Sequence, residues 1–359
     1  MKIHHFEDPA RFRDRVEPYL LQHEAHHNLF FGILHSLIHQ PERYDVAPHL
    51  LTVEDEAGEG IGVALMTPPH KLLLSKVTDF EALSLIAQTL HEQGVHLPGV
   101  LGPTDEARAF AERWQQLTGT SYHLDISQRI YQLEAVEPVP MAPGYLRPAT
   151  AADRDLLVRW AAAFTEDAFG SAEGYDAERT VDGYLRYRTA YIWEDGEPVS
   201  MAVAHGPTPN GIRVSFVYTP PEQRRKGYAT ACVATLSQRL LDQGRRYCFL
   251  FTDLANPTSN HIYQEIGYRP VCDVDALEFV ERRAGSGERN GSGSGERHAP
   301  TCAKYAHTIH ATCNMQRNNS TAHCRSTPPH RHIPTPSQLR RSTSLSMWLK
   351  MTEKCPSPG

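Results

Sequence analysis

One stretch of the sequence, residues 214–228, limits the possible folds more than any other. It reads V-S-F-V-Y-T-P-P-E-Q-R-R-K-G-Y. Its first six residues are mostly β-branched or aromatic, which predicts a strand, and Pro220 and Pro221 end that strand because proline cannot donate to a ladder. From Tyr228, apolar residues recur at helical spacing until Gly244, which predicts a helix. The stretch is therefore predicted to form a strand, a basic glycine turn and a helix.

The turn between these two elements has the composition of an anion site. Arg224, Arg225 and Lys226 are positively charged, and Gly227 has no Cβ, so a ligand can approach its backbone closely. The free amides of a helix N-terminus and the helix dipole both favour negative charge. The sequence contains neither a Walker loop nor a dinucleotide-binding fingerprint. We interpret the turn as a diphosphate site, and the alternative is a solvated basic turn before an ordinary helix.

Two motifs resemble the GNAT superfamily of acyl-CoA-dependent N-acyltransferases. The first fits the family signature R/Q-x-x-G-x-G/A and reads Arg224-x-x-Gly227-x-Ala229. The second is similar to the family's final helix and the turn after it, and reads N-x-x-S-x-x-x-Y-x-x-x-G-Y over residues 256–268. The motifs stand in the family's order, with a predicted helix and strand between them.

The resemblance implies an α/β (α+β) fold built on mixed sheets. Residues 144–283 have the element order β-α-α-β-β-β-α-β-α-β and are predicted to be the catalytic GNAT domain. Residues 1–136 have a related order without the signature turn, which predicts a degenerate GNAT-like domain. The proline-rich residues 137–143 are predicted to be a stiff linker. The predicted fold is therefore two GNAT-like mixed-sheet domains in tandem, followed by a disordered tail over residues 284–359.

The tail differs from the rest of the chain in composition and charge. It begins with a Gly/Ser-rich segment and continues with Thr, Ser, Pro, His and Arg, which cannot bury a core. It contains 10 Lys and Arg against 3 Asp and Glu, whereas the residues before it contain 26 against 39. The acidic body argues against a nucleic-acid partner. Because no apolar run approaches the ~20 residues of a membrane span and the start lacks an apolar signal region, we predict no membrane partner and a cytoplasmic location.

Two groups of residues raise the question of a metal site. His23 and His27 share a helical face, with Glu24 beside them. In the tail, Cys302 and Cys313 are eleven residues apart and belong to no C-x-x-C pair. Neither group has the ligand set of a structural zinc site, so no metal is predicted.

The resemblance assigns the co-substrate, acetyl-CoA, to the turn and its neighbours. The amides of residues 225–229 are expected to hold the diphosphate, with Arg224 as a supporting charge. The strand before the turn is expected to separate from the next strand and to receive the pantetheine arm through the main chain of Val217 and Thr219, while Asn256 hydrogen-bonds the same arm. The predicted cofactor-binding residues are Val217, Thr219, Arg224, Arg225, Lys226, Gly227, Tyr228, Ala229, Asn256 and Ser259.

The same resemblance suggests residues for the chemistry. The N–H of Val217 is the candidate to polarise the thioester carbonyl. Tyr263 is the candidate general acid, because a tyrosine of pKa about 10 can protonate a thiolate whose thiol has a pKa of about 8.5. Many relatives place a glutamate on the strand before the turn, and this strand has no carboxylate. The candidate bases are Glu166 and Asp167 in a predicted loop and His205 at a strand end, and a water relay would also serve.

These expectations combine into one reaction. We predict an acyl-CoA-dependent N-acyltransferase that moves acetyl from acetyl-CoA to a primary amine, on a small molecule or a peptide, by direct attack. The alternative is an acyl-CoA-binding sensor or structural module without turnover, which the missing strand carboxylate keeps open. A longer acyl group is also compatible with the sequence.

Overall fold

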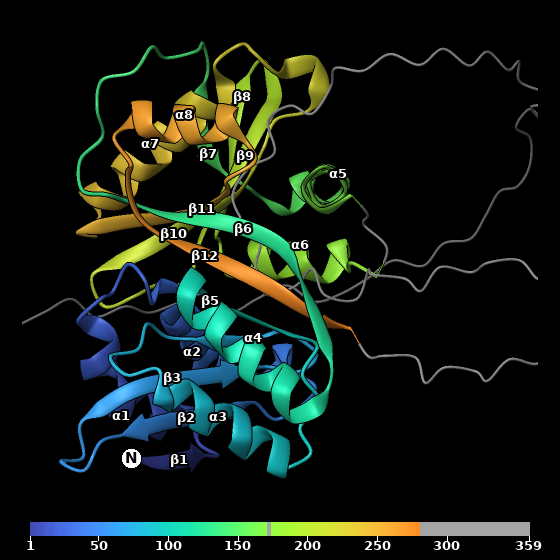
Figure 1. The fold of residues 1–359 in the computed structure, drawn as a ribbon. Helices are drawn as coiled ribbons and strands as arrows, with labels where there is room; N and C mark the ends of the chain where they lie inside the picture. The colour runs from blue at the N-terminus through green and yellow to red at the C-terminus, as the bar shows by residue number, and fades with distance from the viewer. Residues whose placement is uncertain (171–173, 281–359) are drawn as a thin grey trace, which may run out of the picture. The chain divides into compact units, whose positions relative to one another are not determined.

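The computed structural model describes residues 1–170 and 174–280 (Figure 1). The predicted tail, with its cysteines, lies outside these described residues. Within them, every strand belongs to one mixed sheet of twelve strands.

The described residues form two halves with the same order of elements. The first half, residues 1–133, contains β1 (Lys2–Phe6), α1 (Pro9–Leu21), α2 (Asn28–His39), β2 (His49–Glu54), β3 (Gly60–Met66), β4 (Leu72–Leu74), α3 (Glu81–Glu92), β5 (Gly99–Pro103), α4 (Thr104–Thr118) and β6 (Ser121–Leu133). The second half, residues 145–280, contains β7 (Tyr145–Pro148), α5 (Arg154–Phe169), α6 (Ala177–Arg186), β8 (Ala190–Asp195), β9 (Glu197–His205), β10 (Gly211–Tyr218), α7 (Tyr228–Asp242), β11 (Tyr247–Asp253), α8 (Pro257–Ile266) and β12 (Arg269–Val280). Both read β-α-α-β-β-β-α-β-α-β, so the predicted tandem fold is confirmed.

The two halves exchange their last strands at the centre of the sheet. The strand order is β1-β2-β3-β4-β5-β12-β6-β11-β10-β9-β8-β7. Strand β12 is antiparallel to β5 of the first half, and β6 is antiparallel to β11 of the second half. The two exchanged strands also pair with each other along most of their length, and Figure 1 shows them crossing between the halves. The last strand of each half therefore completes the sheet of the other half. The domain boundaries predicted from the sequence assign each strand to its own half and do not show this pairing.

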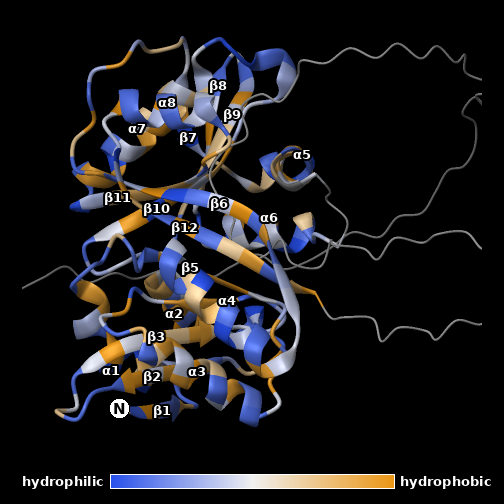
Figure 2. Cartoon of the chain, in the orientation of Figure 1, coloured by the Kyte–Doolittle hydropathy of each residue, from blue (hydrophilic) through white to orange (hydrophobic). Residues whose placement is uncertain are grey.

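Helices cover both faces of the sheet in each half. In the first half, α3 and α4 pack on one face and α1 and α2 on the other. Figure 2 shows hydrophobic residues dominating α2, β2 and β3, as expected for elements buried on most sides. In the second half, α7 and α8 pack on one face and α5 and α6 on the other. The exchanged strand contributes Leu277, 2% exposed, to the core under α3 and α4.

The exchange predicts that a residue of the last strand stabilises the first half. Leu277→Ala should reduce the free energy of unfolding by about 2–5 kcal/mol, because it leaves a cavity in that core. Leu124 lies opposite Leu277 in the register but is 51% exposed, so Leu124→Ala is the matched control and should have little effect. Urea unfolding of both variants measures the difference. Equal small losses would contradict the assignment of Leu277 to the first core.

Three local predictions were wrong. Residues 165–170, predicted to be a loop, continue α5 to Phe169, where Gly170 in the left-handed region (φ 77°) ends the helix. The polar residues there do not break it, since the Thr165 hydroxyl donates to the carbonyl of Ala161 at 2.9 Å. The sequence of residues 268–274 and 277–280 predicts two short strands to finish the sheet, but residues 269–280 form the single strand β12. Strand β1 was missed because a short sheet edge with two histidines has no strong apolar alternation.

Candidate functional site

The strand before the basic turn leaves its neighbour after only three residue pairs. β10 and β11 are parallel, and their register covers residues 211–213 against 247–249. On its other side, β10 pairs with β9, and this register shifts between Ser215 and Tyr218. Phe216 lies within the shift at φ 54°, a left-handed conformation that an aromatic residue rarely adopts. The bulge therefore accompanies the separation of β10 from β11, which is the separation that the resemblance implies.

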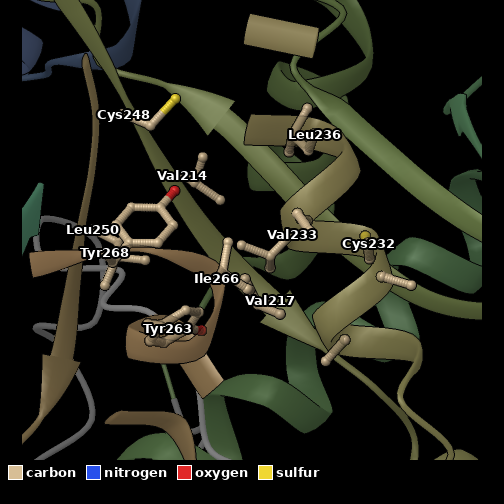
Figure 3. Packing of buried hydrophobic residues seen from close by; sticks show 14 of the residues in the cluster. Val214, Val217, Cys232, Val233, Leu236, Cys248, Leu250, Tyr263, Ile266 and Tyr268 are labelled. Carbon is tan, nitrogen blue, oxygen red and sulfur yellow. The ribbon is translucent and has the colours of Figure 1, made fainter. Parts of the chain in front are cut away.

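The bulge also decides which side chains of β10 face each layer. Val214 and Val217 pack into the core that contains α7 and α8. Phe216 and Tyr218 pack instead into the core formed by α5 and α6. Figure 3 shows Val217 beside Tyr263, which belongs to the same core. The side chain of Val217 and the candidate acid Tyr263 thus lie on one side of the sheet.

The turn after β10 presents its backbone at the start of a 15-residue helix, α7. Arg225 (φ 64°) and Gly227 (φ 81°) are both left-handed, and Gly227 caps the helix without a side-chain hydrogen bond. Left-handed residues of this kind turn successive amides toward one concave surface, which binds anions. The first amides of α7, from Tyr228 onward, have no intrahelical acceptor. The geometry is suited to a diphosphate.

Arg224 stabilises this turn through the contacts of its side chain. Its Nε donates to the carbonyl of Thr219 at 3.0 Å, and its Nη2 donates to the Asp167 carboxylate at 2.5 Å. The guanidinium also lies over the ring of Tyr218, at 5.9 Å from the centroid. Asp167 is therefore an ion-pair partner of the turn, which removes it from the free candidate bases.

The second motif forms the start and body of α8. Asn256 caps the helix, and its Oδ1 accepts the N–H of Ser259 at 3.1 Å. Ser259 is fully buried, and among the described residues its Oγ has no hydrogen-bond partner. Tyr263 is 1% exposed and meets Tyr268 edge to face, with ring centroids 5.9 Å apart. An unsatisfied buried hydroxyl beside the predicted acid is consistent with a ligand that supplies the missing partner.

The remaining candidate bases lie in different environments. Glu166 is exposed on the last turn of α5. His205, at the end of β9, has its Nε2 2.6 Å from the Oγ of Ser215 on β10. Ser215 precedes Val217 by two residues, on the strand where many relatives carry glutamate. The sequence analysis named His205 but missed Ser215, because only the β9–β10 register brings the two together.

A large cleft opens on the α5–α6 side of this strand. Its volume is about 1340 Å³, and it reaches His205 and Tyr184 of the second half. Helix α2 and residues 40–45 of the first half form its other wall. The first half therefore forms part of the wall of a cleft that reaches β10.

The corresponding place in the first half is filled by protein groups. After β4, the N–H of Lys76 donates to Nε2 of His27 at 3.1 Å, and the N–H of Val77 donates to the Glu106 carboxylate at 3.2 Å. The helix that follows, α3, has the acidic Glu81 in its first turn. Side chains already accept hydrogen bonds from these amides, and the Glu81 carboxylate would repel an anion. The first half is therefore unsuited to a diphosphate.

One of the histidines singled out in the sequence, His27, has structural contacts. Nδ1 of His27 lies 2.8 Å from the carbonyl of Leu20, so both ring nitrogens are engaged, and burial lowers its pKa to about 3. Over residues 1–170 and 174–280, no group of three or more His, Cys, Asp or Glu is placed to hold a metal ion. No helix within the same ranges has the length and apolar character needed to cross a bilayer.

Comparison with known proteins agrees with the motifs. Residues 154–268 match the model of the acetyltransferase (GNAT) family. A GCN5-related N-acetyltransferase from Sphaerobacter thermophilus superposes with a TM-score of 0.51 at 14% identity, over 77% of this chain and 95% of that one. A Drosophila protein superposes with a TM-score of 0.57 at 11% identity, over 77% of this chain and 98% of that one. A search of curated proteins gave no match.

The matched segment contains the parts of the site that the geometry singled out. It includes the separating strand β10, the turn that ends at Gly227, helix α7 and the motif of α8. Members of this family are acyl-CoA-dependent acyltransferases that use acetyl-CoA as co-substrate. Residues 154–268 of the chain thus match the acetyltransferase (GNAT) family.

Proposed function

We propose that the protein is an N-acyltransferase that moves acetyl from acetyl-CoA to a primary amine by direct attack. The observation that carries the proposal is the separation of β10 from β11 beyond Arg213, which leads directly into the left-handed turn at Arg225 and Gly227. A strand gap beside a helix N-terminus provides both parts that the long co-substrate needs, a channel and an anion site.

The residues present fit acetyl-CoA. The amides of residues 225–229 would hold the diphosphate, helped by the charges of Arg225 and Lys226. The main chain of Val217 and Thr219 would bind the pantetheine arm, with Asn256 and the unsatisfied hydroxyl of Ser259 nearby. Bound there, the co-substrate supplies the acetyl group as a thioester.

The chain's own groups then have separate roles in the transfer. The N–H of Val217 stabilises the developing oxyanion, and Tyr263 holds the proton for the leaving thiolate. We assign the amine's proton to His205, which contacts Ser215 where a strand carboxylate is absent. Glu166 stays the weaker candidate, because it is exposed on α5.

Several further assignments complete the proposal. The acceptor is a small-molecule or peptide amine that enters through the cleft, and the acidic body disfavours nucleic acid. We propose the division into residues 1–136, 137–143, 144–283 and 284–359, in which the first is a degenerate partner domain. We also propose a cytoplasmic location.

The missing strand carboxylate favours one competing function, an acyl-CoA-binding sensor without turnover.

Acetyl-CoA should stabilise the full-length protein. At about 100 times its Kd, a ligand that binds only the folded state adds ~2.7 kcal/mol, which appears as a higher Tm. Thermal unfolding with and without acetyl-CoA measures this shift, and thiol release with a panel of amines then separates an enzyme from a sensor. Absence of any shift would refute acyl-CoA binding, and a shift without thiol release would favour the sensor.

A further inference from the structure

The cleft between α2 and α6 contains a buried arginine. Arg213 lines the cleft from β10 and is only 7% exposed. Its guanidinium lies 5.8 Å from the centroid of the Phe251 ring. Burial lowers its pKa to about 10, so it stays positively charged at neutral pH. A cation is therefore held at the bottom of the cleft.

This cation has no anionic partner among the described residues. Its one hydrogen bond there runs from Nη1 to Oδ1 of Asn28 at 3.5 Å, which is long and therefore weak. No carboxylate of residues 1–170 or 174–280 forms an ion pair with it. Buried charges are costly unless they are paired, so an unpaired one that faces a cleft indicates a ligand of opposite charge.

Two glycines make room for the guanidinium. A Cβ at Gly32 of α2 would lie 2.9 Å from the Cα of Gly206 and 3.7 Å from Nη2 of Arg213. A Cβ at Gly206, which has φ +62°, would lie 3.2 Å from the same Nη2. The backbone of both halves thus comes close to the guanidinium and fixes where it lies.

The carboxylates of the cleft are already engaged. Its five carboxylates bind arginine side chains, a tyrosine hydroxyl or a backbone amide, and they are Glu42, Asp45, Asp176, Glu178 and Asp182. Arg179 and Arg186 pair with Asp45 and Glu42 at the rim. Arg213 differs from these rim arginines because it lies deep and keeps its charge unpaired.

We propose that Arg213 binds an anionic group of the acceptor, so that the substrate is an amine that also carries a carboxylate or a phosphate. This inference rests on the proposed acyl transfer. Arg213 and Val217 are four residues apart on β10, so at ~3.3 Å per residue their Cα atoms lie at most about 13 Å apart. The planar fork of donors on arginine suits both anions.

Matched acceptors test the inference in the full-length protein. The rate of thiol release is measured with 6-aminohexanoate, its amide 6-aminohexanamide, and 6-aminohexyl phosphate, which separates carboxylate from phosphate. Wild type should prefer one of the anions to the neutral amide by at least about tenfold in kcat/KM, and Arg213→Gln should abolish that preference. Arg186→Gln removes a rim arginine that already pairs with Glu42, so it should leave the preference unchanged.

Binding supplies a readout that does not need turnover. Calorimetric titration with glutarate and with inorganic phosphate should show binding of one anion to wild type, weakened at least about tenfold in Arg213→Gln. Arg213→Lys keeps the charge without the fork, so it should retain part of the affinity and serves as the test if the glutamine variant does not fold.

The outcomes separate this inference from the proposed function. Acetyl-CoA binding with equal use of the acids and the amide, in wild type and Arg213→Gln alike, would overturn the anion site and leave acyl transfer standing. Anion binding that depends on Arg213, without any effect of acetyl-CoA, would support the site and refute the acyl-CoA assignment. If neither anion binds to wild type, or binding is unchanged in the folded Arg213 variants, the inference is wrong.

Discussion

Gly227→Asp is expected to weaken acetyl-CoA binding at least about 100-fold. The new carboxylate would lie at the N-terminus of α7, where the diphosphate is proposed to bind, and two like charges about 4 Å apart near a surface repel by ~4 kcal/mol. The left-handed φ of 81° adds a conformational cost for any residue with a Cβ, on the order of 1–2 kcal/mol. A Cβ there would meet only the Cβ of Ala142, at 3.7 Å, so the variant should still fold.

Two companion variants separate charge from conformation. Gly227→Ala keeps the backbone cost and adds no charge, so it should retain much more affinity than the aspartate. Gly58, in the β2–β3 turn, has nearly the same φ of 83° and open space around a Cβ. Gly58→Asp should therefore lower the Tm by a similar amount and leave acetyl-CoA affinity unchanged. Calorimetric titration of the three variants gives the comparison.

One result would remove the diphosphate assignment. If Gly227→Asp binds acetyl-CoA as tightly as Gly58→Asp, the anion site does not lie at this turn, and the basic residues before α7 are a solvated surface. Loss of binding in Gly227→Ala as large as in the aspartate variant would instead point to the backbone conformation.

The sequence predicted the local order of the elements well. Residues 214–228 form the expected strand, turn and helix, because prolines, a glycine and apolar spacing all act over a few residues. The left-handed backbone of Arg225 and of Phe216 was not predicted, since only the surrounding structure holds a residue other than glycine there. Local signals thus located the turn but could not give the conformation that makes it concave.

Contacts between segments that are far apart in the sequence could not be predicted from the sequence pattern. The exchange of β6 and β12 depends on which strands meet at the centre of the sheet, and both strands have the same alternation in either pairing. The ion pair of Arg224 with Asp167 and the contact of His205 with Ser215 join residues from different elements. In the sequence, Arg213 is a single charge in an apolar strand. Only the structure places it in the cleft beside α2, which is the basis of the proposed anion site.

Tyr263→Phe is expected to reduce kcat by about 10²–10⁴-fold while acetyl-CoA affinity changes little. The ring is 1% exposed and packs in the core with Val217, so phenylalanine preserves its packing and removes the hydroxyl proton alone. A general acid acts only while protonated. Wild-type kcat should therefore fall at high pH, and this limb of the profile should be absent in the variant.

Tyr268→Phe is the matched control for this prediction. Tyr268 is also fully buried and stacks edge to face on Tyr263, but its hydroxyl lies 2.8 Å from the Oγ of Ser237. Losing that hydrogen bond should cost about 1 kcal/mol of stability and leave kcat and its pH profile unchanged. If Tyr263→Phe keeps full kcat, the thiolate receives its proton from solvent or another group, and Tyr263 is a core residue of α8. If both variants lose kcat equally, the effect comes from packing in the shared core, because only Tyr263 is assigned the proton.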